Sequence, residues 1–434
     1  ANASCTPGSP PNPCHAGTTS CATGMQTCTD NGPVANGLAC GAAGDNMTCN
    51  SGTCGCGPGL MLCTNVCVNT QTSLTNCGGC GQGCSGGSCA AGVCTCPSDF
   101  TDCDGGCVNL TSDPDNCGAC GHGCQGAGCG GDGGITSPGY CQPVTLVSGQ
   151  NGPESVAVDS QNFYWLNYNG GEVDEEPIGL GAVVTLASGQ STPGYLVNDS
   201  SNIYFTTGTS VEKVPIGGAD PPTLLASVPG FSIALANGTV FWANGSLIQS
   251  IPVGGAASPA TLASDSNDPS YIAVDSTNVY WADYAHGTVD AGAIMAIAQN
   301  ATTATDPTPL AMGQSGPLGI AVYSTNVYWA DNIGNVVMQV AKTGGTPSPV
   351  ATGQPGPFAI AVDSTGVYWT NLNGTNPGAA SGTGTIMKLA PGSTSPVTLV
   401  GQQLDPVALF LTSTSIYWVN YSSVDTGTVM RVAK

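Results

Sequence analysis

The stretch that decides the fold is "PVTLVSGQ", residues 143 to 150. It is a short apolar run that ends in a glycine-containing turn, as a β-strand does, and it begins two residues after Cys141, the last cysteine of the chain. A cysteine-dense region precedes this stretch and a long cysteine-free region follows it. The fold depends on which of the two regions it completes.

The cysteine-free region carries an internal repeat. Its marker is a pair of aromatic residues that begins at positions 164, 204, 241, 280, 328, 368 and 417, at intervals of 37 to 49 residues. This interval is the length of one four-stranded blade of a β-propeller. Each repeat resolves into four apolar runs separated by Gly, Pro, Asn or Asp, most clearly at 358–364, 366–372, 384–392 and 395–402.

The number of apolar runs shows to which region the opening stretch belongs. After residue 154 there are seven first, second and third runs but only six fourth runs, because the sequence stops directly after "GTVMRVAK". "PVTLVSGQ" supplies the seventh fourth run, since it matches others such as "PVTLVGQ". We therefore predict an all-β fold: a seven-bladed β-propeller closed by an N-terminal strand (143–150), plus a disulfide-rich, loop-dominated N-terminal arm.

The repeats resemble two known families. The segments "YWLN", "YWAD", "YWTN" and "YWVN" resemble the YWTD propellers of lipoprotein-receptor ectodomains, and "IAVDSTNVYWAD" is similar to bacterial propellers of the NHL kind. The resemblance covers about 290 residues. YWTD propellers have six blades, so a count of seven departs from that family. Both resemblances imply binding and scaffolding.

Two positions of the repeat are filled by recurring side chains. All six tryptophans follow the first aromatic residue of the pair, which predicts packing between blades rather than a platform for sugar stacking. An Asn or Asp two residues after the tryptophan recurs as well, and we expect it to stabilise a turn. These residues are Asn167, Asp283, Asp331, Asn371 and Asn420.

The cysteine-dense region contains a second repeat. Residues 56–95 (repeat A) and 96–141 (repeat B) share the spacing C-x6-C-x3-C-x9-C-x2-C-x3-C-x4-C. Loops this poor in large apolar residues need cross-links, so we predict four disulfides in each repeat. The cysteines are Cys56, Cys63, Cys67, Cys77, Cys80, Cys84, Cys89 and Cys94 in repeat A, and Cys96, Cys103, Cys107, Cys117, Cys120, Cys124, Cys129 and Cys141 in repeat B.

The remaining segments complete the predicted domains. Residues 1–55 form a smaller cysteine-rich module, and residues 142–434 form the propeller. The first module has an odd number of cysteines, and Cys5, nearest the end, is our candidate for an intermolecular disulfide or a free thiol. The "CVN…NCG.CG..C" core at 67–84 and 107–124 resembles stigma-specific-protein-type repeats, as in large secreted bacterial proteins of the myxobacterial type. That resemblance implies no chemistry.

Composition limits the partners. The chain of 434 residues has 5 Lys and Arg against 27 Asp and Glu, a formal charge of -22, which argues against nucleic acid. The many cysteines indicate a secreted or cell-surface protein. No apolar run reaches the ~18 residues of a membrane span and no signal peptide precedes Ala1, so we expect an already processed chain without a transmembrane segment.

Metal sites are weakly indicated. Cys77-x-x-Cys80 and Cys117-x-x-Cys120 have the spacing of zinc knuckles, but their place in an evenly spaced framework favours disulfides. Calcium prefers several oxygen ligands. Its candidates are Glu172, Asp174 and Glu176 in "GGEVDEEP", with Asp102 and Asp104 in the arm; strand alternation places Glu175 on the opposite face. No other cofactor is expected.

The sequence favours a non-enzymatic function. A catalytic triad in the propeller would depend on His286 alone, so we predict no catalytic residues. Our leading hypothesis is a structural or adhesive protein that assembles with itself into an extracellular filament or surface layer through arm-to-propeller contacts. The alternative is a monomeric module, tethered by the arm, that binds glycans or surface proteins. A propeller hydrolase or lyase is the third hypothesis.

Overall fold

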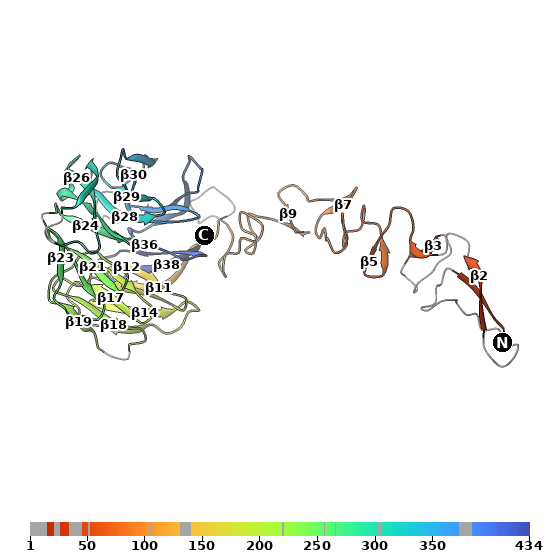
Figure 1. Cartoon of the computed structure of the whole chain (residues 1–434), viewed down its shortest axis with the longest axis horizontal. Coiled ribbons are helices and arrows are strands. Elements are labelled where there is room, and N and C mark those ends of the chain that lie inside the picture. Colours follow the sequence, from red (N-terminus) through yellow and green to blue (C-terminus); the bar gives the residue numbers. More distant parts are fainter. Residues whose placement is uncertain are drawn as a thin grey trace. The chain divides into compact units, whose positions relative to one another are not determined.

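The chain forms two compact units. The computed structural model describes residues 15–20, 27–33, 46–50, 53–104, 106–130, 140–218, 221–255, 257–264, 266–302, 306–372 and 384–434. The first unit is Ala1–Cys129, which we call the arm, and the second is Gly130–Lys434, which we call the propeller (Figure 1). The finer boundaries within the arm, and the start of the propeller at 142, stay predictions.

The propeller consists of seven four-stranded antiparallel sheets, six of which are built from consecutive strands. Blade one contains β12 (Pro153–Val158), β13 (Asn162–Asn167), β14 (Glu172–Pro177) and β15 (Val184–Ala187). Blade two contains β16 (Leu196–Asn198), β17 (Asn202–Thr206), β18 (Val211–Pro215) and β19 (Thr223–Ala226). Blade three contains β20 (Ile233–Ala236), β21 (Thr239–Asn244), β22 (Leu247–Pro252) and β23 (Ala260–Ala263).

The next three blades repeat this order. Blade four contains β24 (Pro269–Val274), β25 (Asn278–Asp283), β26 (Gly292–Ala298) and β27 (Thr308–Gln314), with a short 3-10 turn η1 (Ala285–Gly287) between its second and third strands. Blade five contains β28 (Pro317–Tyr323), β29 (Asn326–Asp331), β30 (Val336–Ala341) and β31 (Ser348–Thr352). Blade six contains β32 (Pro357–Asp363), β33 (Gly366–Asn371), β34 (Gly384–Leu389) and β35 (Val397–Gln403).

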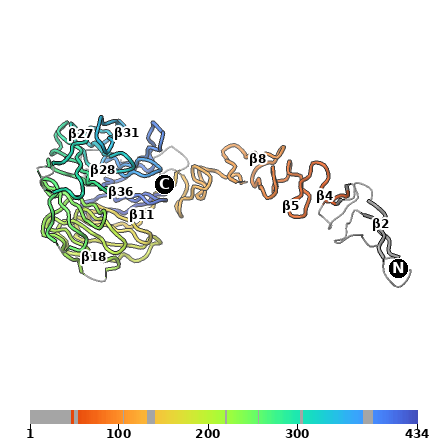
Figure 2. The backbone as a smooth tube through the Cα atoms, viewed as in Figure 1, coloured from red at the N-terminus to blue at the C-terminus, as the bar shows by residue number. Residues whose placement is uncertain are grey.

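The seventh blade joins the two ends of the propeller. It contains β36 (Pro406–Leu411), β37 (Ser415–Asn420) and β38 (Gly427–Ala433), and its fourth strand is β11 (Val144–Gln150). β11 runs antiparallel to β38, with Val147 opposite Val429. Figure 2 shows the chain passing from blade to blade until its blue C-terminal strands lie beside β11. The prediction that the opening stretch closes a seven-bladed ring is confirmed.

The tryptophans pack where neighbouring blades meet. All six have an exposed fraction of 0%. In one such cluster Trp165 and Phe163 of blade one pack with Tyr417 and Val419 of blade seven. Because burying a large aromatic side chain stabilises a core by a few kcal/mol, these contacts hold adjacent blades together.

A glutamine at or just after the outer strand of three blades reaches the next blade, an arrangement we call the glutamine latch. Gln150 Oε1 accepts hydrogen bonds from Trp165 Nε1 at 2.7 Å and Asn167 Nδ2 at 3.0 Å. Gln354 and Gln403 make the same pair of bonds with the Trp and Asn of blades six and seven. The expectation that the recurring residue stabilises a turn is therefore wrong for these three Asn, whose side chains join two blades. It holds for Asp331, whose carboxylate accepts from the backbone of Ser315 and Gly334.

A second recurring contact secures the hairpin between the first two strands of a blade. In blade one the Tyr164 hydroxyl donates to Asp159 Oδ2 at 2.7 Å, and the other oxygen of that aspartate accepts from backbone N–H groups of the turn. Tyr204 with Asp199 and Tyr280 with Asp275 repeat the contact at 2.8 and 3.0 Å. We call this pair the Asp–Tyr lock, and it is the reason for the recurring "DS" before the aromatic pair.

The arm is built from short hairpins joined by disulfides. Its strands are β1 (His15–Ser20), β2 (Thr27–Pro33), β3 (Met47–Asn50), β4 (Thr53–Cys56), β5 (Met61–Cys63), β6 (Val66–Val68), β7 (Ser88–Ala90), β8 (Val93–Thr95), β9 (Thr101–Cys103) and β10 (Gly106–Val108). Repeat A has the disulfides Cys56–Cys67, Cys63–Cys80, Cys77–Cys89 and Cys84–Cys94. Repeat B has Cys96–Cys107, Cys103–Cys120 and Cys117–Cys129 in the same order. Cys49, Cys54, Cys124 and Cys141 are disulfide-bonded as well.

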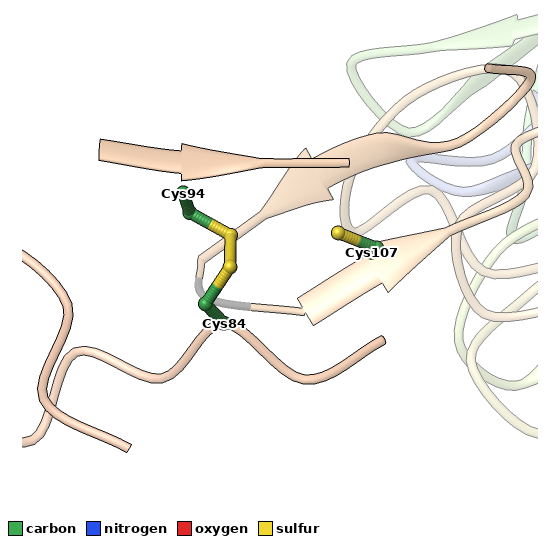
Figure 3. A group of neighbouring side chains, drawn as sticks. All are labelled: Cys84, Cys94 and Cys107. Carbon is green, nitrogen blue, oxygen red and sulfur yellow. A yellow bond between two sulfur atoms is a disulfide. The ribbon is translucent and has the colours of Figure 1, made fainter. Parts of the chain in front are cut away.

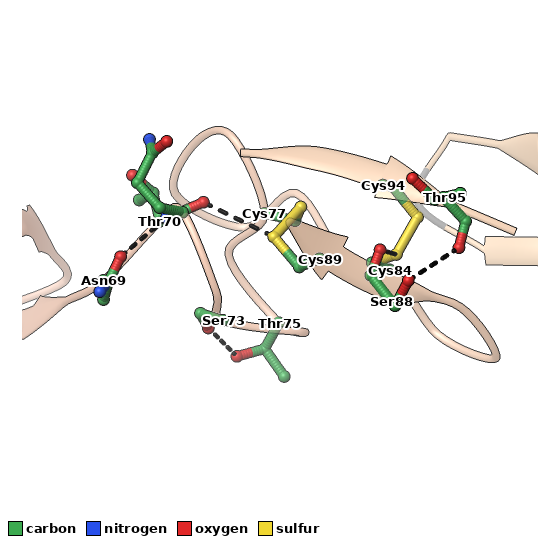
Figure 4. Close-up of a disulfide and its surroundings, with 11 residues drawn as sticks. Asn69, Thr70, Ser73, Thr75, Cys77, Cys84, Ser88, Cys89, Cys94 and Thr95 are labelled. Atoms are coloured by element: carbon green, nitrogen blue, oxygen red, sulfur yellow. Dashed lines mark hydrogen bonds between the residues drawn. A yellow bond between two sulfur atoms is a disulfide. The ribbon is translucent and has the colours of Figure 1, made fainter. Parts of the chain in front are cut away.

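The asparagines of the "CVN…NCG" core form the loops between these disulfides. Asn69 Oδ1 accepts from the backbone of Gln71, and Asn76 Oδ1 accepts from that of Gly81, both at 2.9 Å. Asn109 and Asn116 make the same contacts in repeat B. Figure 4 shows Asn69 at one side of the view, Cys77–Cys89 in the middle and Cys84–Cys94 at the other side. The shared motif thus encodes turn geometry.

Two further predictions concern the whole chain. Cys5, our candidate for an intermolecular disulfide, lies outside the described residues. Within the described ranges, no helix combines the length and apolar character that a bilayer span requires.

Candidate functional site

The predicted acidic calcium cluster on β14 is divided among separate structural contacts. Asp174 accepts from Thr185 Oγ1 at 2.7 Å and from Asn167 Nδ2 at 3.1 Å within its own blade. Glu176 accepts from the backbone of Gly181, whereas Glu175 accepts from Gly217 of the next blade. Burial raises the pKa of Asp174 to about 6 and also raises the pKa of Glu175 and Glu176.

The arm candidates, Asp102 and Asp104, are exposed and line a cavity of about 550 Å³ between repeats A and B. In the described part of the chain, three metal-ligating atoms gather within 4.8 Å only among cysteines. One such group is Cys84, Cys94 and Cys107, and Figure 3 shows that the first two form a disulfide beside the sulfur of the third. Cys107 is bonded to Cys96. These sulfurs are not thiolates, so this group lacks the ligand form that zinc requires. Calcium stays an untested prediction.

The centre of the propeller is filled by aromatic side chains. The innermost strand of each blade faces the central channel of a propeller. Tyr195 of blade two and Tyr271 of blade four meet there, with their hydroxyl oxygens 2.5 Å apart. Phe231 lies against both rings, with ring centroids 5.2 and 6.1 Å away, and Phe358 lies 5.9 Å from Tyr271. Since blades two, four and six are not neighbours, these rings close the channel.

A cavity of about 290 Å³ lies at this point, and we call it the channel cup. Its lining residues come from blades one, three, six and seven and are Glu154, Tyr168, Phe231, Phe358, Val407 and Tyr421. Glu154, Phe358 and Val407 belong to innermost strands, and Tyr168 and Tyr421 follow the second strands of blades one and seven. Phe231 and Tyr168 are exposed by 45% and 37%, so the cup is open to solvent.

Glu154 is the one acidic residue among these six lining residues. It is half-buried, and burial raises the pKa of its carboxyl to about 7. A negative charge here is disfavoured because burial among the surrounding rings removes water from the carboxylate. A bound cation would make the ionised carboxylate favourable, since it would neutralise the negative charge while contacting aromatic faces. The cup therefore has the chemistry of a site for an organic cation.

Sequence reasoning missed the channel cup. The signal for this site becomes visible when the seven innermost strands are aligned. The alignment uses the residue of each strand that lies opposite the second member of the aromatic pair. Two residues earlier, the seven blades carry Glu154, Gly194, Phe231, Ser270, Leu318, Phe358 and Val407. In four of the blades the residue at this position lines the cup, so a carboxyl here would have been conspicuous. His286, by contrast, lies in η1 with an 80% exposed side chain, 3.4 Å from Asp268.

Comparisons with known proteins show the fold alone. No family profile and no curated protein sequence matches the chain. A virginiamycin B lyase from Staphylococcus aureus aligns with 16% identity and a TM-score of 0.54, over 68% of this chain and 98% of that one. A streptogramin B lyase gives 12% and 0.53, over 68% and 97%. The WD40 propeller domain of Doa1 gives 13% and 0.52, over 67% and 95%.

Proposed function

We propose that this protein is an extracellular, non-enzymatic binding module whose propeller captures, in the channel cup, a ligand with a cationic amine and an apolar body. The observation that carries the proposal is the isolated carboxyl of Glu154 among Tyr168, Phe231, Phe358 and Tyr421. The extracellular assignment rests on the disulfides of the arm, which persist in oxidising compartments.

The inventory of the cup favours binding over catalysis. The lining residues offer one carboxyl and two tyrosine hydroxyls, and none of the six is a histidine, lysine or cysteine. General acid–base chemistry needs a second positioned group, and nucleophilic catalysis needs an activated nucleophile. The lyase activity named for two structural neighbours does not transfer at 12 to 16% identity.

Titration calorimetry with phenethylamine and its neutral analogue phenethyl alcohol tests this function. The amine should bind more tightly than the alcohol, and its affinity should rise with pH through about 7 as Glu154 ionises. Glu154→Gln should weaken amine binding about 10- to 100-fold, because a charge-assisted hydrogen bond is lost, and should abolish the pH dependence. Glu172→Gln, which lies outside the cup, should change neither the affinity for the amine nor its pH dependence. Equal affinity for amine and alcohol would contradict the proposal.

Self-assembly is our second candidate function, and one feature of repeat A favours it. Its side chains Met61, Leu62, Leu74 and Val93 are 46%, 51%, 52% and 62% exposed. At the positions of Met61 and Leu62, repeat B has Thr101 and Asp102. Repeat B exposes Phe100 by 43%, but repeat A exposes more large apolar side chains among the described residues, which indicates a contact surface specific to repeat A.

Transferring the residues of repeat B into repeat A tests assembly. Negative-stain microscopy of the purified protein at high concentration should show filaments or sheets, and Met61→Thr with Leu62→Asp should leave monomers. Both substitutions use residues that the same scaffold already accommodates in repeat B. Monomers of the unmodified protein at high concentration would contradict assembly and leave the binding function standing.

A further inference from the structure

Blade five departs from the repeat at the Asp–Tyr lock. Blades one, two, four and six have an aspartate at or just after the end of the first strand, whereas blades three and seven have Ala236 and Thr412, and blade five has Tyr323. Without a carboxylate the lock cannot form in blade five, and in its turn between Tyr323 and Asn326 the residue Ser324 has φ 51°. Backbone in this left-handed region is unfavourable for a serine, so the departure has a conformational cost.

The tyrosine of the aromatic pair is also more exposed in blade five than in the other blades that have one. The tyrosine of the aromatic pair is buried, with at most 2% exposed, at Tyr164, Tyr204, Tyr280, Tyr368 and Tyr417. Its equivalent in blade five, Tyr328, is partly exposed, and Tyr323 is 37% exposed. Both rings line a cavity of about 650 Å³ between blades five and six, which we call the tyrosine groove.

The far wall of the tyrosine groove mixes apolar and polar residues of blade six. Its polar side chains include Ser364, Ser393 and Thr394, and Gln339 of blade five also lines the groove. Asn326 Nδ2 donates to Gln339 Oε1 at 3.0 Å, which leaves the amide N–H groups of Gln339 as donors toward a ligand. Hydroxyls and an amide can both donate and accept.

The one acidic residue among the described lining of the groove is already neutralised. The Asp363 carboxylate forms an ion pair with Lys434 Nζ. Burial raises the pKa of Asp363, but hydrogen bonds from Lys434 and Thr365 outweigh it and hold this pKa below its usual value. On a chain with a formal charge of -22, a groove without free positive charge does not suit an anion. It suits a neutral ligand.

From this lining we infer that the tyrosine groove is a binding site for a neutral oligosaccharide, with sugar rings stacked on Tyr323 and Tyr328 and their hydroxyls bonded to the polar wall. Aromatic faces beside neutral donors and acceptors match the two kinds of surface that a pyranose presents. The site is separate from the channel cup and does not depend on the function proposed for it.

Oligosaccharide binding can be tested with a substitution that restores the aspartate of the repeat in blade five. Saturation-transfer NMR and calorimetry with cellohexaose, xylohexaose, maltohexaose and chitohexaose should identify at least one that binds. Tyr323→Asp should place a carboxylate where blades one, two and four have one, keep the fold and weaken binding about tenfold or more, because a stacking ring is lost. Tyr323→Phe should retain binding, since the ring remains.

Control experiments show whether the oligosaccharide binds in the tyrosine groove or in the channel cup, and whether the groove prefers a peptide. Glu154→Gln should leave oligosaccharide binding unchanged, and circular dichroism should show that Tyr323→Asp folds. The inference is overturned if none of the four probes binds at millimolar concentration, or if binding survives Tyr323→Asp. Binding of an oligoproline peptide in place of the sugars, dependent on Tyr323, would also overturn the oligosaccharide assignment.

Discussion

Replacing Gln150 by alanine should destabilise the propeller far more than the same change at Gln190. Gln150 ends β11, and its Oε1 accepts from Trp165 Nε1 at 2.7 Å and Asn167 Nδ2 at 3.0 Å. Trp165 and Asn167 are only 0% and 4% exposed. Alanine would leave the buried indole N–H without its acceptor, while Asn167 keeps its bond to Asp174.

The magnitude follows from these contacts. A net hydrogen bond contributes about 0.5–1.5 kcal/mol, and an unsatisfied buried donor costs about 1–3 kcal/mol, so we expect a loss of about 2–4 kcal/mol. For a domain of this size, that corresponds to a decrease in Tm of about 3–7 °C.

Gln190 is the matched control. It ends "TLASGQ" in blade one, and its Nε2 donates to Ser188 O at 3.2 Å, just as Gln150 Nε2 donates to Ser148 O. The next blade has Phe205 and Thr207 in place of Trp and Asn, so it offers no indole or amide to this glutamine. Gln190→Ala removes the local bond alone and should cost about 0.5 kcal/mol or less.

Thermal and urea unfolding of the two variants measure the difference directly. In a Trp165→Phe background the effect of Gln150→Ala should shrink, because the principal donor is gone. Equal stability of the Gln150→Ala and Gln190→Ala variants would refute the claim that the latch holds the closing strand to blade one.

The remaining predictions concern buried acids and the arm. Asp331→Asn should stabilise the propeller by about 1–2 kcal/mol in urea unfolding. The indole N–H of Trp329 has no partner in the described part of the chain, and an Asn at 331 can donate to Gln314 and so complete a glutamine latch for this tryptophan. Unchanged stability of the Asp331→Asn variant would contradict this prediction. Burial raises the pKa of Glu154, Asp174 and Asp283 to about 7, 6 and 6, so the folded chain holds protons that the unfolded chain releases, and stability should fall as pH rises from about 4 to 7. Each tenfold change in the acidity constant of one group corresponds to about 1.4 kcal/mol. Denaturation midpoints at pH 4.5 and 8 check this, and a higher midpoint at pH 8 would refute it. Peptide mapping of repeat A without reductant should give the same 1–3, 2–5, 4–7 and 6–8 pairing as the structure, and any other pairing would be inconsistent with it.

The fold followed from the sequence because its repeat is regular. Strand breaks at Gly, Pro, Asn and Asp and the constant aromatic pair locate the blades, and a missing fourth run identifies β11. The number of disulfides in repeat A could be predicted from the cysteine count alone. Which cysteines pair could not be predicted, since eight cysteines allow 105 connectivities.

The sites were harder to predict because they arise where the repeat is broken. Glu154 is one acid among 27, and only the alignment of innermost strands places it at the channel. Tyr323 has the pattern of an ordinary strand residue until the Asp–Tyr lock is known. The recurring Asn looks like a turn residue in the sequence because its partner, a glutamine of the preceding blade, lies 17 residues away.

Native-state hydrogen exchange on the full chain tests most directly whether β11 closes the ring. Because β11 is the outer strand, those amides of Val144–Gln150 that point toward β38 should exchange as slowly as the amides of Gly427–Ala433, with which they form one antiparallel ladder. Exchange of Val144–Gln150 at the rate of an unstructured peptide, while Gly427–Ala433 stays protected, would contradict the account.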